Sequence, residues 1–341
     1  MTRAIHVGRL GTLTEEQLQA ALDRFELGTL VGASAVAFGL FGQNVFVDSD
    51  VGSHVLRFGA HYDWQFPTER FFCERIHTRT DVPVPWPYLW EPSPDVFGYR
   101  WGYVLMPRLP GIATADRQVY EQLSYVDRLG IAETLGSALR RLHRVTWTTS
   151  GAFDHTTGRI EPFAATYAQR SRDRIATTVE NAAVHSGDLT SAEREWVVQS
   201  TEAVAVERDD FQPVLVHEDF NTNNVCFERE DTTWQLAGLF DLMTAHIGDG
   251  LNDLPRQFCM YVEEDPSLAA AYLHAYVDSE TLDSDATARL RLYLLDERLI
   301  VWEFFHRPEF LAMWQGGNGS FREWFATYEQ ALDSATALKR D

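Results

Sequence analysis

The stretch from Val214 to Leu254 reads VLVHEDFNTNNVCFEREDTTWQLAGLFDLMTAHIGDGLNDL, and it decides the fold. Its first three residues are apolar and predict a short buried strand that leads into a polar loop. Two further apolar segments, 225–227 and 236–240, flank a polar turn and predict a hairpin. Because a hairpin returns the end of its second strand beside the start of its first, we expect Asp241 to lie next to Asn224.

The polar loop between the strand and the hairpin carries a third oxygen side chain, Asp219. A carboxylate from Asp241 and an amide oxygen from Asn224 suit Mg²⁺, and a second carboxylate nearby suits a hydroxyl that must lose its proton. Alone, an HxD triplet is more often a simple turn, because Asp and Asn bend the backbone. Here several such elements recur in order, which favours a site over a turn.

The segments HEDFNTNN (217–224) and LFDLMTAHIGDGLNDL (239–254) resemble the aminoglycoside phosphotransferase family, distant relatives of the protein kinases. That family carries an HxDxxxxN catalytic loop, then an Asp at the end of a strand and a GDxxxD segment. The first pattern is matched by His217, Asp219 and Asn224, and the second by Asp241, Gly248, Asp249 and Asp253.

The resemblance implies an α+β, bilobal protein kinase-like fold. Residues 1–107 would form an N-terminal nucleotide-binding lobe, an antiparallel sheet with a helix, and residues 108–341 a larger, mainly helical catalytic and acceptor-binding lobe. The residue patterns agree, since strand-like runs over 34–58 precede long stretches of helical periodicity. We expect helices at 14–25, 66–80, 125–145, 191–208, 248–263 and 266–276.

A glycine-containing loop between the first two strands, with Gly39, Gly42 and Asn44, stands where the family holds nucleotide phosphates. Glycine lets backbone amides approach phosphate, although in a strand pair it more often marks a bulge. The family's third-strand cation falls on Arg57, where many kinases have lysine. The chain contains one lysine, Lys339 near its C-terminus, so an arginine must supply this cation.

In the family, a glutamate from the following helix pairs with this cation. Glu69 has the matching spacing and is preferred over Glu74 on the grounds of helix face. The strand near 101–106 resembles the hinge that meets adenine, with Met106 and Arg108 as the candidate contacts. Between them Pro107 has no N–H, so we expect an amide donor such as that of Arg108.

The resemblance also implies a role for each of the site residues. Asp219 would accept or orient the proton of the substrate hydroxyl. Asn224 and Asp241 would hold Mg²⁺ on the phosphates of ATP or GTP. His217, Asp249 and Asp253 would support the loop or cap helices.

The acceptor should bind in the helical lobe, which is acidic. Residues 251–300 hold ten Asp or Glu against four Arg, and Asp296, Glu297 and Glu303 share a helix with aromatic residues. These carboxylates are candidates for binding a cationic acceptor such as an aminoglycoside. A solvated acidic helix face is an equally good interpretation.

Composition excludes several classes of protein. A formal charge of −21 argues against nucleic acid or an anionic membrane as a partner, although solubility or a salty habitat would explain it as well as a cationic substrate. No segment has about 18 uncharged apolar residues, and the first residues lack the apolar core of a signal peptide. Three cysteines without metal-ligand spacing favour a reduced cytoplasm.

The leading hypothesis is an ATP- or GTP-dependent O-phosphotransferase for a small-molecule hydroxyl, plausibly an antibiotic-inactivating enzyme for an aminoglycoside. The acceptor could instead be a macrolide, a nucleoside antibiotic, choline, homoserine or a sugar. A nucleotide-binding pseudokinase is the alternative from another class, and the intact Asp219, Asn224 and Asp241 speak against it.

Overall fold

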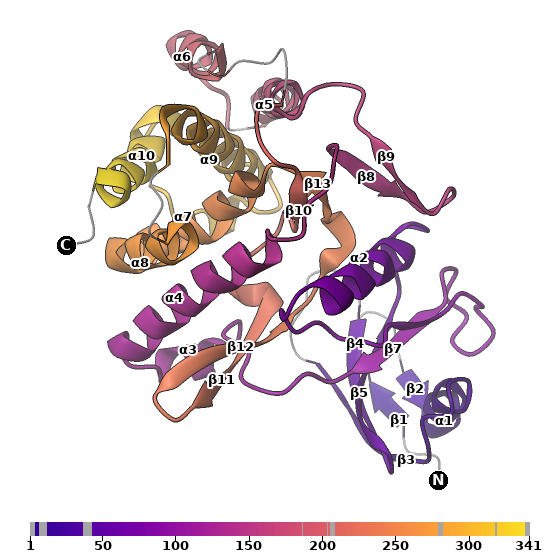
Figure 1. Cartoon of the computed structure of the whole chain (residues 1–341). Helices are drawn as coiled ribbons and strands as arrows, with labels where there is room; N and C mark the ends of the chain where they lie inside the picture. Colours follow the sequence, from indigo (N-terminus) through magenta and orange to yellow (C-terminus); the bar gives the residue numbers. More distant parts are fainter. Residues whose placement is uncertain are drawn as a thin grey trace. The chain divides into compact units, whose positions relative to one another are not determined.

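The computed structural model describes residues 4–6, 12–36, 43–185, 187–202, 204, 209–278, 282–317 and 319–337 (Figure 1). Contacts divide the chain into two compact units. Unit 1 comprises Met1–Leu123, Phe153–Arg159 and Thr222–Ala245, and unit 2 comprises Ser124–Ala152, Ile160–Asn221 and His246–Asp341. Each unit is therefore assembled from separate stretches of chain, whereas the predicted division is a single boundary after residue 107.

Unit 1 is built on a five-stranded antiparallel sheet with the order β3-β4-β5-β7-β6. Its strands are β3 (Leu30–Ala35), β4 (Gln43–Ser49), β5 (Gly52–Phe58), β7 (Tyr103–Pro107) and β6 (Leu89–Glu91). The antiparallel meander expected from the runs in 34–58 is confirmed. The sequence does not predict strand β6, because prolines lie on both sides of it and are unfavourable within a sheet.

Helix α1 (Glu15–Asp23) packs on this sheet through Leu18 and Leu22, which are fully buried in one cluster with Val45 and Leu56. Its start follows the predicted capping box: the Thr14 side chain accepts from the backbone of Gln17, whose side chain accepts from the Thr14 N–H. A second helix, α2 (Gln65–Arg79), follows β5 and corresponds to the helix predicted over 66–80.

The predicted hairpin is also part of unit 1. It is formed by β11 (Val225–Glu230) and β12 (Thr233–Leu239), with Val225 opposite Leu239. The remaining elements of unit 1 are β1 (Ala4–His6), β2 (Thr12–Thr14), α3 (Arg117–Glu121), η2 (Thr222–Asn224) and η3 (Leu242–Thr244). The hairpin geometry needed to join Asn224 and Asp241 is therefore present.

Unit 2 is mainly helical. Its helices are α4 (Tyr125–Leu142), α5 (Tyr167–Ala183), α6 (Ser191–Glu202), α7 (Leu254–Glu264), α8 (Pro266–Val277), α9 (Ser284–Phe305) and α10 (Phe321–Ala337), with short turns η4 (Gly250–Asp253) and η5 (Leu311–Met313). Helices α4 and α8 pack closely at Gly136, where a Cβ would lie 2.2 Å from the carbonyl oxygen of Tyr272. Only glycine permits that approach.

A small four-stranded sheet corrects one prediction. It has the order β10-β13-β8-β9, with strands β10 (Val214–Val216), β13 (His246–Gly248), β8 (Gly151–Asp154) and β9 (Arg159–Pro162). The helix expected at 248–263 therefore begins only at Leu254, because Gly248 ends a strand and Asp249 caps the short turn η4. Helix α6 spans Ser191–Glu202, and residues 203 and 205–208 of the helix predicted over 191–208 lie outside the described residues.

The three cysteines, Cys73, Cys226 and Cys259, are all buried and reduced. Burial raises the pKa of the Cys226 and Cys259 thiols to about 12, and that of Cys73 well above its usual value. In the described part of the chain, no helix has both the length and the apolar character needed to cross a membrane.

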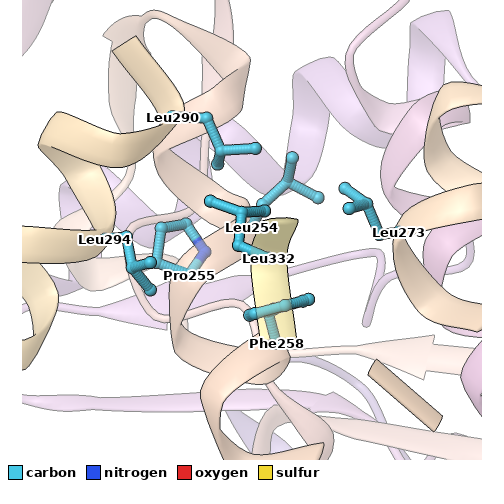
Figure 2. Close-up of a pocket in the computed structure, with 7 residues that line it drawn as sticks. All are labelled: Leu254, Pro255, Phe258, Leu273, Leu290, Leu294 and Leu332. Carbon is cyan, nitrogen blue, oxygen red and sulfur yellow. The ribbon is translucent and has the colours of Figure 1, made fainter. Parts of the chain in front are cut away.

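A small apolar gap lies inside unit 2 (Figure 2). It is lined by Leu254, Pro255, Phe258, Leu273, Leu290, Leu294 and Leu332. A gap bounded by aliphatic and aromatic carbon, without polar groups to orient a ligand, is a packing defect of the helical core. The candidate site lies elsewhere.

Candidate active site

Arg57 is the centre of a buried ion cluster in unit 1. It lies on β5, and the residue is only 5% exposed. Its Nη1 donates to Glu69 Oε2 at 2.7 Å, and its Nη2 donates to Asp241 Oδ1 at 3.1 Å. One guanidinium thus connects α2 with the segment that follows β12.

The structure distinguishes the two glutamates considered as partners of Arg57. Glu69 is buried and also accepts from the Tyr88 hydroxyl at 2.8 Å, whereas Glu74 pairs with the neighbouring Arg75 near the surface. Burial raises the pKa of the Glu69 carboxyl to about 7, against the opposing effect of Arg57. The guanidinium is therefore held by a carboxylate that is itself fixed by a second donor.

Beside this cluster, two buried polar atoms have no hydrogen-bond partner among the described residues. Asn44 stands directly opposite Arg57 in the β4–β5 ladder, and neither Asn44 Oδ1 nor Arg57 Nε is satisfied. Buried polar atoms in proteins are nearly always paired, so such orphans indicate a place for a ligand or water. The predicted loop residues Gly39 and Gly42 lie outside the described residues.

Asn224 and Asp241 lie together at one end of the hairpin. The Asn224 carbonyl accepts from the Phe240 N–H at 2.9 Å, and Asp241 follows directly. Asp241 has φ of 62°, a left-handed conformation that Asp tolerates better than most residues, and its side chain is 33% exposed. An amide and a carboxylate oxygen fit Mg²⁺, which typically takes one or two protein carboxylates and completes its octahedron with water and phosphate.

The segment after β7 corrects the prediction for Arg108. The Arg108 amide donates to the Ser53 carbonyl on β5 at 3.0 Å, so it is not available to a base. Strand alternation then turns the backbone groups of Met106 towards β5 as well, and those of Pro107 towards the opposite edge. Leu109, two residues after Pro107, carries the next N–H of the same parity and is a candidate donor that the sequence does not single out.

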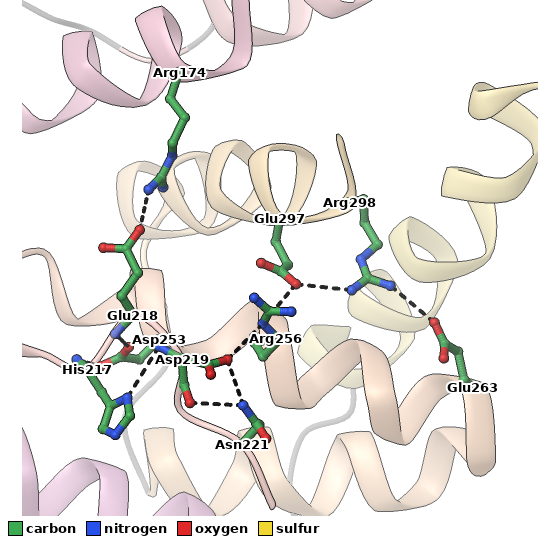
Figure 3. A network of polar contacts seen from close by, with 10 residues as sticks. All are labelled: Arg174, His217, Glu218, Asp219, Asn221, Asp253, Arg256, Glu263, Glu297 and Arg298. Atoms are coloured by element: carbon green, nitrogen blue, oxygen red, sulfur yellow. Dashed lines mark hydrogen bonds and ion pairs between the residues drawn. The ribbon is translucent and has the colours of Figure 1, made fainter. Parts of the chain in front are cut away.

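In unit 2, Asp253 holds the loop that follows β10 (Figure 3). Its carboxylate is buried and accepts from the backbone N–H groups of His217 at 2.8 Å and Glu218 at 2.7 Å. His143 Nε2 lies 3.1 Å from the same carboxylate. Two consecutive amides fixed by one side chain leave this part of the loop with a single backbone conformation.

Asp219 follows these two residues and is held by its own loop. Asn221 Nδ2 donates to Asp219 Oδ1 at 2.8 Å and to the Asp219 carbonyl at 2.9 Å. The Asp219 side chain is 42% exposed, and Arg256 Nε lies 3.3 Å from its Oδ1. The carboxylate is therefore oriented but open to solvent, as an acceptor of a substrate proton must be. The loop passes from unit 2 to unit 1 between Asn221 and Thr222.

Glu218 occupies a left-handed conformation, with φ of 71°. Its side chain pairs with Arg174 of α5, and its Oε2 lies 3.0 Å from His246 Nδ1. Burial acts to raise the pKa of Glu218, but His246 and Arg174 outweigh it and hold that pKa well below its usual range. These ion pairs compensate for a backbone conformation that a glutamate rarely adopts.

Asp249 has the supporting position expected of it. It caps η4 through the Leu251 N–H and accepts from Arg289 Nε at 2.7 Å and from the Tyr293 hydroxyl at 2.9 Å. Both donors lie on α9, so Asp249 ties the start of η4 to that helix.

The three carboxylates of α9 predicted to receive the acceptor are buried. Asp296 pairs with Arg174 at 2.7 Å. Both carboxylate oxygens of Glu303 accept from Arg307, in a bidentate ion pair. Glu297 lies between Arg256 at 3.2 Å and Arg298 at 3.3 Å. Sequence showed their charge but not their burial, and this placement offers no exposed carboxylate of α9 at these positions to a cationic acceptor.

A sequence profile described as the phosphotransferase enzyme family matches residues 33–293 of the chain. The matched region contains every site residue above except the three carboxylates of α9. Among curated proteins, none matches the sequence.

Several solved structures have the same fold. Aminoglycoside phosphotransferase APH(4)-Ia superposes with a TM-score of 0.66 at 14% identity, covering 94% of this chain and 98% of that one. Macrolide 2'-phosphotransferase MphH from Brachybacterium faecium gives 0.58 at 19% identity, with 96% and 99% coverage. Wild-type aminoglycoside 2'-phosphotransferase-IIIa, in its GDP complex, gives 0.60 at 12% identity, with 94% and 98% coverage. The predicted protein kinase-like fold is confirmed.

Proposed function

The chain belongs to the phosphotransferase enzyme family, and from this premise we propose that it is an ATP- or GTP-dependent O-phosphotransferase acting on the hydroxyl of a small molecule. The observation that carries the proposal is the buried ion pair of Arg57 with Glu69, which also engages Asp241. Phosphoryl transfer depends on positioning and charge neutralisation, and a fixed cation between a helix carboxylate and a candidate metal ligand serves both.

Each side chain then has one role. Asp219 orients the acceptor hydroxyl and takes its proton. Asn224 and Asp241 would hold Mg²⁺, which when bound neutralises charge on the nucleotide phosphates. Arg57 binds the phosphates that are not transferred, and its unsatisfied Nε is a donor available for that purpose.

The adenine or guanine base would meet the strand edge after Met106. There the Pro107 carbonyl is the acceptor and the Leu109 amide is the donor that replaces the one predicted at Arg108. Neither group distinguishes ATP from GTP by itself, so both nucleotides belong in the test.

The acceptor is proposed to be an antibiotic hydroxyl or that of another small metabolite. APH(4)-Ia, one of the proteins with this fold, was solved as a thermostable mutant with ADP and hygromycin B. At such low identity this supports nucleotide and small-molecule binding in general, and the macrolide, nucleoside, choline, homoserine and sugar alternatives remain. Three buried, reduced cysteines support a cytoplasmic location.

The test is a nucleotide-consumption screen with ATP and with GTP in the presence of Mg²⁺. The panel should contain aminoglycosides, macrolides, nucleoside antibiotics, amino alcohols and sugars, with Asp219→Ala as the inactive control. We expect consumption that depends on one class of acceptor and on Asp219. Nucleotide binding without acceptor-dependent consumption would instead identify a pseudokinase, and failure to bind either nucleotide would overturn the proposal.

A further inference from the structure

Arg256 lies against the candidate catalytic carboxylate (Figure 3). It is the third residue of α7, and its Nε is 3.3 Å from Asp219 Oδ1 and 3.2 Å from Glu297 Oε1. Its side chain is 34% exposed, similar to that of Asp219. Any hydroxyl that approaches Asp219 therefore approaches a guanidinium as well.

The N–H groups of Arg256 are not used in hydrogen bonds to other described residues. Its Nε is buried without a hydrogen-bond partner, since neither carboxylate lies in hydrogen-bond geometry, and within the described residues Arg256 donates no hydrogen bond. The neighbouring Arg174 and Arg298 differ, because each donates to two carboxylates. A guanidinium that is held only by charge retains its donors for a ligand.

Glu218 and Glu297, which lie beside Asp219 and Arg256, are themselves ion-paired with other arginines. Glu218 is paired with Arg174, and Glu297 is paired with Arg298. Since Glu297 has Arg298 as a second partner, Arg256 is a cation that faces Asp219 without being needed to neutralise Glu297.

We propose that Arg256 is a specificity-determining residue that binds an anionic group of the acceptor, a carboxylate or a phosphate, close to the hydroxyl that is phosphorylated. This inference rests on the proposed function and narrows it to hydroxyl compounds with a nearby oxyanion, in place of polycations. The terminal nitrogens of Arg256 donate to the oxyanion, while Asp219 takes the proton of the hydroxyl.

The test compares acceptors that share one skeleton. Glucuronate and glucose 6-phosphate carry an oxyanion, glucosamine carries an ammonium group, and glucose is neutral. Acceptor-dependent nucleotide consumption is measured for each with the wild type, with Arg256→Gln, and with Arg291→Gln as control. Arg291 is a half-exposed arginine of α9 that likewise faces two carboxylates, Glu329 and Asp333.

We expect wild-type kcat/KM to favour an anionic acceptor, with the carboxylate and phosphate arms showing which oxyanion is preferred. Arg256→Gln should lower the ratio of anionic to ammonium acceptor by about tenfold or more, mainly through KM, with the nucleotide KM unchanged. A residue that merely held Asp219 in place would lower kcat for all acceptors and leave the ratio unchanged, which would overturn the proposal. Arg291→Gln should leave the ratio unaltered.

Arg256→Lys keeps the charge and serves if the glutamine variant does not fold. It should retain the preference for anions with a raised KM, and a loss of the preference would count against the proposal. Turnover confined to aminoglycosides or glucosamine would reject the role of Arg256. If Asp219→Ala abolishes that turnover, the proposed phosphotransferase function still stands. Absence of turnover with both anionic compounds likewise rejects it.

Discussion

Arg57 in unit 1 and Arg256 in unit 2 each lie between two carboxylates, yet their environments differ. Arg57 is buried in the sheet and donates directional hydrogen bonds to Glu69 and Asp241. Arg256 is partly exposed and is bound to Asp219 and Glu297 by charge alone. Equal formal charges thus give one cation of fixed geometry and one that can exchange partners. The first suits an invariant ligand such as a nucleotide, and the second suits selection among acceptors.

The largest effect is expected from removing the carboxylate that Arg256 faces. Asp219→Asn keeps the shape of the side chain but cannot accept the hydroxyl proton, so kcat should fall by about 10²–10⁴ while nucleotide affinity is unchanged. Steady-state kinetics and nucleotide titration measure the two quantities. Asp188→Asn, at an exposed carboxylate paired with Arg194, is the control, and near-normal turnover by Asp219→Asn would refute the assignment.

The next largest effect should come from Arg57→Ala. The change leaves Glu69 and Asp241 without their shared cation, and loss of one partner from a buried ion pair costs about 3–5 kcal/mol. Denaturant unfolding should show this loss, and nucleotide binding should weaken far more than acceptor binding. Arg75→Ala removes a partly exposed arginine that pairs with the exposed Glu74 and should cost less than about 1 kcal/mol. Equal stability of the two variants would show that Arg57 is not held as a fixed, buried cation.

A smaller effect is expected at Asp253. In Asp253→Asn an amide replaces one oxygen, so one of the two loop N–H groups of His217 and Glu218 loses its acceptor. Leaving a buried donor unsatisfied costs about 1–3 kcal/mol. We expect that loss in unfolding free energy together with a fall in kcat, since Asp219 follows this turn directly. Unchanged kcat with reduced stability would show that the loop holds its shape without Asp253.

The smallest effect concerns the pH dependence of the stability that Glu218 contributes. The pKa of Glu218 is lowered in the folded state, so its charge contributes stability at neutral pH, and this contribution is lost as pH falls below the ordinary range of a glutamate. Glu218→Gln should therefore be less stable than the wild type near pH 7, and the difference should shrink towards pH 3. Thermal unfolding followed across this range measures it. A difference that stays constant with pH would contradict the role of the ion pairs to Arg174 and His246.

Much of the site could be predicted because most of its residues lie close together in the sequence. The strand, loop and hairpin lie within 41 consecutive residues, so periodicity and turn residues were enough to bring Asn224 beside Asp241. The pairing of Arg57 with Glu69 depended on helix spacing, which sequence also contains.

The rest depends on contacts between distant segments. Nothing in the spacing of Arg174 or Arg256 indicates that they meet the catalytic loop. Arg174 lies 44 residues before Glu218 and Arg256 lies 37 residues after Asp219, each on a separate helix. The role given to Arg108 failed because strand register, which decides where an amide points, is not visible in one strand alone. The burial of Asp296, Glu297 and Glu303 depends on the elements that pack against α9, which are not visible in the sequence of α9 alone.

The alkylation rates of the three buried thiols report local unfolding around each of them. A thiol with a raised pKa and no solvent contact reacts with an alkylating reagent only when its surroundings unfold. Cys73 lies on α2, four residues after Glu69, and Cys259 lies on α7, three residues after Arg256. Labelling rates can therefore be followed separately in the two units. A bound nucleotide should slow the labelling of Cys73, and a bound acceptor should slow that of Cys259.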